Sequence, residues 1–112
     1  MNIVKALEAA QSENPHGVDA RGLHSTEHVQ VTMITLKPGE GLKLHLTPVD
    51  AFFYVLEGTG KVEIGGEVQE IVKDMLIDSP ARIPHRLFNE SDADFRFLVV
   101  KTPRQADATR LL

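Results

Sequence analysis

The chain has 112 residues, a formal net charge of −4 at neutral pH and a hydrophobic content of 42%. This length suits one domain with a single core and is too short for two domains of ordinary size. The acidic balance argues against non-specific nucleic-acid binding, which needs a basic surface that displaces counterions. Because the sequence has no cysteine, it can form no disulfide, and any metal site would have to use nitrogen and oxygen ligands.

The first residues do not have the pattern of a targeting or membrane segment. Lys5 and Glu8 interrupt the apolar run that a signal peptide would need. No stretch approaches the roughly 20 consecutive apolar residues of a membrane-spanning helix. We therefore expect a cytoplasmic protein with no membrane partner. Residues 3–13 are predicted to form a short N-terminal helix or arm that ends at Asn14-Pro15.

From residue 28 onward the pattern is one of strands and turns. Residues 28–36 are rich in β-branched side chains and alternate apolar with polar positions. Gly65-Gly66 predicts a tight hairpin, because two glycines supply the positive φ angles of a two-residue turn. Short strands with no helical period between them indicate an all-β sandwich or barrel. The predicted strands cover 28–36, 42–46, 51–56, the hairpin 62–68, 75–78, 85–89 and 94–100.

The predicted organisation is an arm over residues 1–27 that packs on the barrel, a barrel over 28–101 and a tail over 102–112. If residues 42–46 form a regular strand, Leu42, Leu44 and Leu46 lie on the face opposite His45. An exposed apolar row of this kind is typical of a partner surface, and we expect a homodimer. The alternative is that the N-terminal segment of the same chain covers these leucines.

The spacing of two histidines, His45 and His85, resembles the paired motifs of the cupin family. The first motif has a glycine, two histidines, a glutamate and a closing glycine, and the second has two glycines, a proline, a histidine and an asparagine. The matching residues are Gly39, His45, Gly58, Pro80, His85 and Asn89. The departures are Thr47 at the second histidine, Ala51 at the glutamate, and Asp74 and Arg82 at two glycines.

The resemblance implies a double-stranded β-helix, that is, a jelly-roll barrel, over most of the chain. It also implies that His45 and His85 are two of the four ligands of a divalent metal such as iron, manganese, nickel or zinc, held here at low occupancy. Asp50 is the candidate to replace the missing carboxylate, provided that an irregularity at Pro48 turns it inward. His16, His24 and His28 are not expected to be ligands. The predicted pocket residues are Thr47, Ala51, Phe53, Gln30 and Asn89.

Three functions are compatible with these residues. The first is a barrel that binds a small molecule in its pocket, with or without a weakly bound metal. The second is a metal-dependent enzyme of the isomerase, dioxygenase or decarboxylase type that acts on a small carboxylate or hydroxylated substrate. The third is a structural protein with a solid barrel in which the histidines are packed. Fold alone does not select among them.

Overall fold

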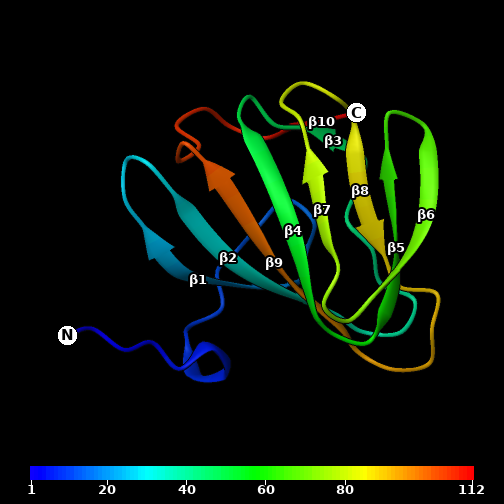
Figure 1. Ribbon diagram of the computed structural model, residues 1–112, viewed down its shortest axis with the longest axis horizontal. Helices are drawn as coiled ribbons and strands as arrows, with labels where there is room; N and C mark the ends of the chain where they lie inside the picture. Colours follow the sequence, from blue (N-terminus) through cyan, green and yellow to red (C-terminus); the bar gives the residue numbers. More distant parts are fainter.

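The computed structural model describes residues 1–112 as two five-stranded antiparallel sheets that enclose one core (Figure 1). The first sheet has the order β1 (Asp19–Ser25), β2 (Gln30–Leu36), β9 (Phe95–Thr102), β4 (Asp50–Glu57) and β7 (Leu76–Ser79). The second has the order β10 (Arg110–Leu111), β3 (His45–Leu46), β8 (His85–Phe88), β5 (Thr59–Ile64) and β6 (Glu67–Val72). The all-β, double-stranded β-helix prediction is therefore confirmed.

The core forms because the central strands alternate between buried and more exposed side chains. On β4, Ala51, Phe53 and Val55 are buried while their sequence neighbours are not. Phe95 and Phe97 continue this inner layer on the adjacent strand β9 and are fully buried. Burial of such side chains stabilises the fold by about 1.5 to 3 kcal/mol each. The cluster of buried apolar residues comprises Ala20, Ile34, Leu36, Leu42, Phe53, Val55, Val62, Ile71, Leu87, Phe95, Phe97 and Val99.

One end of the barrel is filled by aromatic side chains, which leaves the cavity at the other end. The ring of Phe95 lies so close to Gly60 that a Cβ at that glycine would be 2.1 Å from it. Only glycine leaves room there for the ring. The opposite end, where β9 ends and β4 and β8 begin, holds polar side chains. The C-terminal segment passes over this end before β10 pairs with β3 (Figure 1).

Most predicted strands are present within one or two residues of their expected bounds. The Gly65-Gly66 hairpin is confirmed: it joins β5 to β6, and both glycines have positive φ angles of 58° and 86°. Residues 42–46 differ from the prediction, because only His45 and Leu46 form a strand. The expected alternation therefore fails: Leu42 joins the core, whereas Leu44 and Leu46 are half-buried. The homodimer remains a prediction.

The predicted N-terminal helix over residues 3–13 is wrong, since the segment contains only a 3-10 turn, Ala6–Glu8. Ile3 and Leu7 remain 75% and 63% exposed, so no apolar face packs against the barrel to stabilise a helix. An isolated helix of this length is marginal in water. Two segments outside the predicted barrel also form strands, β1 within residues 1–27 and β10 within residues 102–112. No helix of the chain is long and apolar enough to span a membrane.

Two turns adopt the left-handed conformation without a glycine. Asp74 has φ 71° and Arg82 has φ 62°. These are the two positions at which the second cupin motif, to which the sequence was compared above, has glycine. For residues with a Cβ, the left-handed region costs roughly 1 to 2 kcal/mol. The turns therefore keep the backbone geometry of the motif although the sequence has lost its glycines.

We expect Arg82→Gly to raise the free energy of unfolding by about 0.5 to 1 kcal/mol, the relief of strain being partly offset by greater freedom of the unfolded chain. Urea denaturation measures the effect. Asp74→Gly is the matched comparison and should gain less, because it loses the hydrogen bond from Tyr54 Oη to Asp74 Oδ1, which is 3.0 Å long. A lower denaturation midpoint for Arg82→Gly would contradict the strain argument.

Candidate functional site

A cavity of about 180 Å³ lies at the polar end of the barrel. Three imidazoles line it, from His16, His45 and His85, together with the side chain of Lys101. No aspartate or glutamate lines it. The predicted pocket residues Thr47, Ala51 and Phe53 also line this cavity. The site is thus a small, mostly apolar space with an excess of basic groups.

The two motif histidines converge because their strands are neighbours. His45 on β3 is paired in register with His85 on β8. Their Nε2 atoms are 3.0 Å apart, and the two rings are nearly perpendicular. Both residues are buried, at 6% and 3% exposure. The sequence spacing predicted this juxtaposition.

Hydrogen bonds assign the tautomers of this pair. The Lys43 carbonyl can only accept, so His45 Nδ1 donates to it at 2.6 Å. When His45 is neutral, its Nε2 carries the lone pair and accepts from His85 Nε2. His85 Nδ1 is then the acceptor for the Ser79 hydroxyl at 2.6 Å. The result is a chain of hydrogen bonds with one direction, from Ser79 through both imidazoles to the Lys43 carbonyl.

His16 was not expected to be a ligand and was not among the predicted pocket residues. The structure places its ring 4.5 Å from that of His45 between centroids. The Lys43 backbone N–H donates to His16 Nδ1 at 2.9 Å, so the proton of a neutral His16 lies on Nε2. The Nε2–H has no acceptor within the protein. His16 therefore offers a free donor at the cavity.

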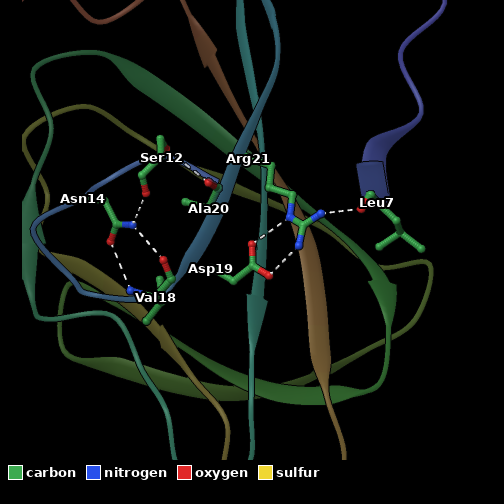
Figure 2. A network of polar contacts seen from close by, with 7 residues as sticks. All are labelled: Leu7, Ser12, Asn14, Val18, Asp19, Ala20 and Arg21. Carbon is green, nitrogen blue, oxygen red and sulfur yellow. Dashed lines mark hydrogen bonds and ion pairs between the residues drawn. The ribbon is translucent and has the colours of Figure 1, made fainter. Parts of the chain in front are cut away.

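The loop that carries His16 is held by its own polar side chains (Figure 2). Asn14 Nδ2 donates to the carbonyls of Ser12 and Val18, while its Oδ1 accepts from the backbone N–H of His16 and Val18. Ser12 Oγ donates to the Ala20 carbonyl on β1. These bonds close residues 12–18 into a compact turn. No short sequence motif predicts that this loop folds back onto the barrel, because the residues that it bonds to lie on β1 and just before β3.

The residues before this loop are fastened to β1 by a second cluster (Figure 2). Arg21 donates to both carboxylate oxygens of Asp19, at 3.0 and 3.2 Å. Its remaining terminal nitrogen donates to the Leu7 carbonyl. One guanidinium therefore joins the N-terminal segment to the strand that follows the loop.

Burial keeps the imidazoles uncharged at neutral pH. It lowers the pKa of His85 from 6.5 to about 3, with smaller contributions from positive charge at His45 and Lys101. It lowers the pKa of His16 from 6.5 to about 4, with added repulsion from His45 and Lys43. Burial also lowers the pKa of His45, although the bond to the Lys43 carbonyl opposes the shift.

Lys101 is the second functional residue that sequence reasoning missed. Its side chain continues the inward row of Phe95, Phe97 and Val99 on β9, and burial lowers its pKa. Its Nζ donates to Gln105 Oε1 at 2.6 Å. The signal that could have found it is strand parity, because every second residue from Phe95 points inward. The predicted strand ended at residue 100, one position before Lys101, whereas β9 extends to Thr102.

Three predicted site residues do not reach the cavity. Asp50 is exposed, and its Oδ1 accepts from the Ala81 N–H at 2.8 Å, so no irregularity turns this carboxylate toward the histidines. Asn89 is fully buried but donates to the carbonyls of Leu36 and Ala93, which makes it a structural residue. Gln30 lies beside Lys101 in the register of β2 and β9, outside the cavity wall, with a buried and unpaired Oε1.

The residues present do not fit a resident divalent metal. No group of three or more metal-binding side chains is placed to hold an ion. Two Nε2 atoms 3.0 Å apart could contact one ion, but the hydrogen bond between them already occupies both. The cavity has no carboxylate to balance a divalent charge, and Lys101 adds a positive one.

The hydrogen-bond chain predicts the ring tautomers. We expect the Nδ1–H form for His45 and the Nε2–H form for His16 and His85 at pH 7. Long-range ¹H–¹⁵N correlation spectra of the imidazoles distinguish the two forms. His28, whose side chain is 82% exposed, is the internal comparison. An Nε2–H form of His45 would contradict the direction of the chain.

The lowered pKa values predict a loss of stability in acid. A histidine with a lower pKa in the folded state takes up a proton on unfolding, so the free energy of unfolding falls as pH drops below about 6.5. The loss for His16 ends near pH 4 and that for His85 near pH 3. The two shifts taken at face value give about 3 kcal/mol between pH 6.5 and 5. Solvent screening at the half-buried His16 reduces the expected decrease to about 2 kcal/mol.

Urea denaturation at several pH values measures this dependence. His16→Gln should flatten the slope between pH 6.5 and 4, whereas His28→Gln, which removes an exposed imidazole, serves as the matched control. Equal slopes in wild type and His16→Gln would show that His16 is not held neutral by the fold.

Comparisons with known proteins agree with the barrel and its motifs. The cupin-domain family model matches residues 32–101. No match was found among curated proteins. The protein TT1209 from Thermus thermophilus is 30% identical, with 93% of this chain and 99% of that chain covered and a TM-score of 0.80.

Two more distant structures share the fold. The polyketide cyclase RemF from Streptomyces resistomycificus is 20% identical, with 100% of this chain and 85% of that chain covered and a TM-score of 0.86. KdgF from Halomonas sp. is 18% identical, with 96% of this chain and 97% of that chain covered and a TM-score of 0.83. The matched motif region, the two sheets and the paired histidines together show that this chain belongs to the cupin family.

Proposed function

We propose that this protein binds a small molecule in its barrel cavity and that His45 and His85 serve as neutral hydrogen-bonding groups, not as ligands of a resident metal. The observation that carries the proposal is the cavity itself, a space of about 180 Å³ at the open end of the barrel where the two motif histidines meet. This space is smaller than the roughly 300 to 1,000 Å³ of pockets for drug-sized ligands. A small metabolite suits it, and a solid structural barrel would not contain it.

The arrangement of polar groups supports binding over metal-dependent catalysis. His45 and His85 use all four ring nitrogens in bonds to each other, to Ser79 and to the Lys43 carbonyl. Every ring nitrogen of the two histidines therefore already has a hydrogen-bond partner within the protein. The groups that remain available to a ligand are His16 Nε2–H and Lys101 Nζ, while Phe53 supplies an apolar wall.

Metal content tests the proposal first. We expect far less than one metal ion per chain in untagged protein by mass spectrometry, even after incubation with iron, manganese, nickel and zinc. His45→Ala and His85→Ala are the controls and should not change the content. Near one ion per chain, lost in both variants, would overturn the proposal and favour the metal-dependent enzyme.

Ligand stabilisation tests the binding itself. A screen of small acids, amides, alcohols and sugars against metal-free protein should contain compounds that raise the melting temperature, since a ligand specific for the folded state stabilises it by mass action. Phe53→Ala enlarges the cavity and should weaken the response. If no compound shifts the melting temperature at about 10 mM, well above the dissociation constant expected of a small metabolite, the barrel is not a binding protein.

A further inference from the structure

We infer that the ligand of this cavity is a small monocarboxylate whose carboxylate group is held by Lys101, an inference that rests on the proposed binding function. The first observation is the direction of the side chain. Lys101 follows Phe95, Phe97 and Val99 on the inward row of β9 and lines the same cavity as the histidines. A lysine on this face has its ammonium inside the barrel mouth and not on the outer surface.

The second observation is that this ammonium has no counter-ion. Lys101 takes part in none of the protein's ion pairs. Its hydrogen-bond partner is the neutral amide oxygen of Gln105, and no carboxylate lines the cavity. A charged group that is largely removed from water costs free energy unless it is paired. The lowered pKa of Lys101, which burial causes, agrees with that cost. A bound anion would supply the missing partner.

The third observation is where the free donors lie. The His45–His85 pair is saturated, so a ligand must bond to other groups. His16 Nε2–H has no protein acceptor and also lines the cavity. An ammonium and a neutral N–H on the same cavity match the two oxygens of a carboxylate, which only accept hydrogen bonds.

The size and lining of the cavity favour a carboxylate over a phosphate. One ammonium balances a single negative charge, whereas a phosphate dianion would keep a second charge in a partly apolar space. Ile34, Phe53 and Val99 line the same cavity and suit a short hydrocarbon group. Its volume of about 180 Å³ restricts the ligand to a few carbon atoms beyond the carboxylate.

Matched probes test the charge requirement. Full-length protein freed of metal on a chelating resin is titrated by calorimetry with butanoate, with its neutral analogue butyramide, and with inorganic phosphate. We expect butanoate to bind at least about tenfold more tightly than either of the others, the usual effect of a charge-assisted hydrogen bond.

Two lysine variants test the assignment to Lys101. Lys101→Met keeps the volume and the aliphatic stem but removes the charge, and it should weaken butanoate binding by about tenfold or more. Lys73→Met makes the same charge change on an exposed side chain that does not line the cavity, and it should leave the affinity within about twofold. Circular dichroism confirms that both variants are folded.

Each failure separates this inference from the broader proposal. If butyramide binds as tightly as butanoate, or if Lys101→Met keeps full affinity, the carboxylate site is overturned while small-molecule binding stands. If phosphate binds more tightly than butanoate, the ligand class is wrong. No butanoate binding up to about 20 mM also overturns the inference. The ligand screen above then decides independently whether the cavity binds anything.

Discussion

A barrel of this size can keep three imidazoles and an ammonium at its mouth only if each is uncharged, hydrogen-bonded or exposed to solvent on one side. The peptide of Lys43 provides much of this balance for the imidazoles. Its carbonyl accepts from His45 and its N–H donates to His16, so one backbone unit assigns the tautomers of two rings. The tautomer of His85 follows through its bond to His45. The charge state of the cavity thus depends on an irregular stretch of backbone next to β3.

The cavity is assembled from segments on both sides of the family motifs. The matched region, residues 32–101, contributes His45, His85 and Lys101. The loop before β1 adds His16, and the segment after β9 adds Thr109, whose hydroxyl accepts from Gln105. Gln105 in turn accepts from Lys101. The flanking segments therefore set the polarity of the mouth, while the barrel provides its shape.

The departures from the motif affect chemistry and backbone differently. Thr47 and Ala51 lie in the cavity where the motif has ligands, so the metal-binding chemistry is reduced to a hydrogen-bonded pair of histidines. Asp74 and Arg82 keep the positive φ angles of the lost glycines. Backbone geometry is retained because each of these turns carries the chain from one sheet to the other, and the strands that flank it must keep their register with β4 and β5. Side chains that point into a cavity face no such constraint.

The sequence by itself determined the features that are encoded in local patterns and motif spacing, namely strands, turns and the pairing of the two motif histidines. Period-two alternation located β2, two consecutive glycines located the hairpin, and the spacing of His45 and His85 predicted that they lie together. Only the tertiary structure decided the positions of His16 and Asp50 and the inward position of Lys101 beyond the predicted strand end. The physical reason is that these side chains lie in loops or at strand ends. For His16 and Asp50, hydrogen bonds to residues distant in the sequence set the direction of the chain, and no local period encodes them. For Lys101, the parity of β9 gives the inward direction, but only the tertiary structure shows that the strand extends past residue 100.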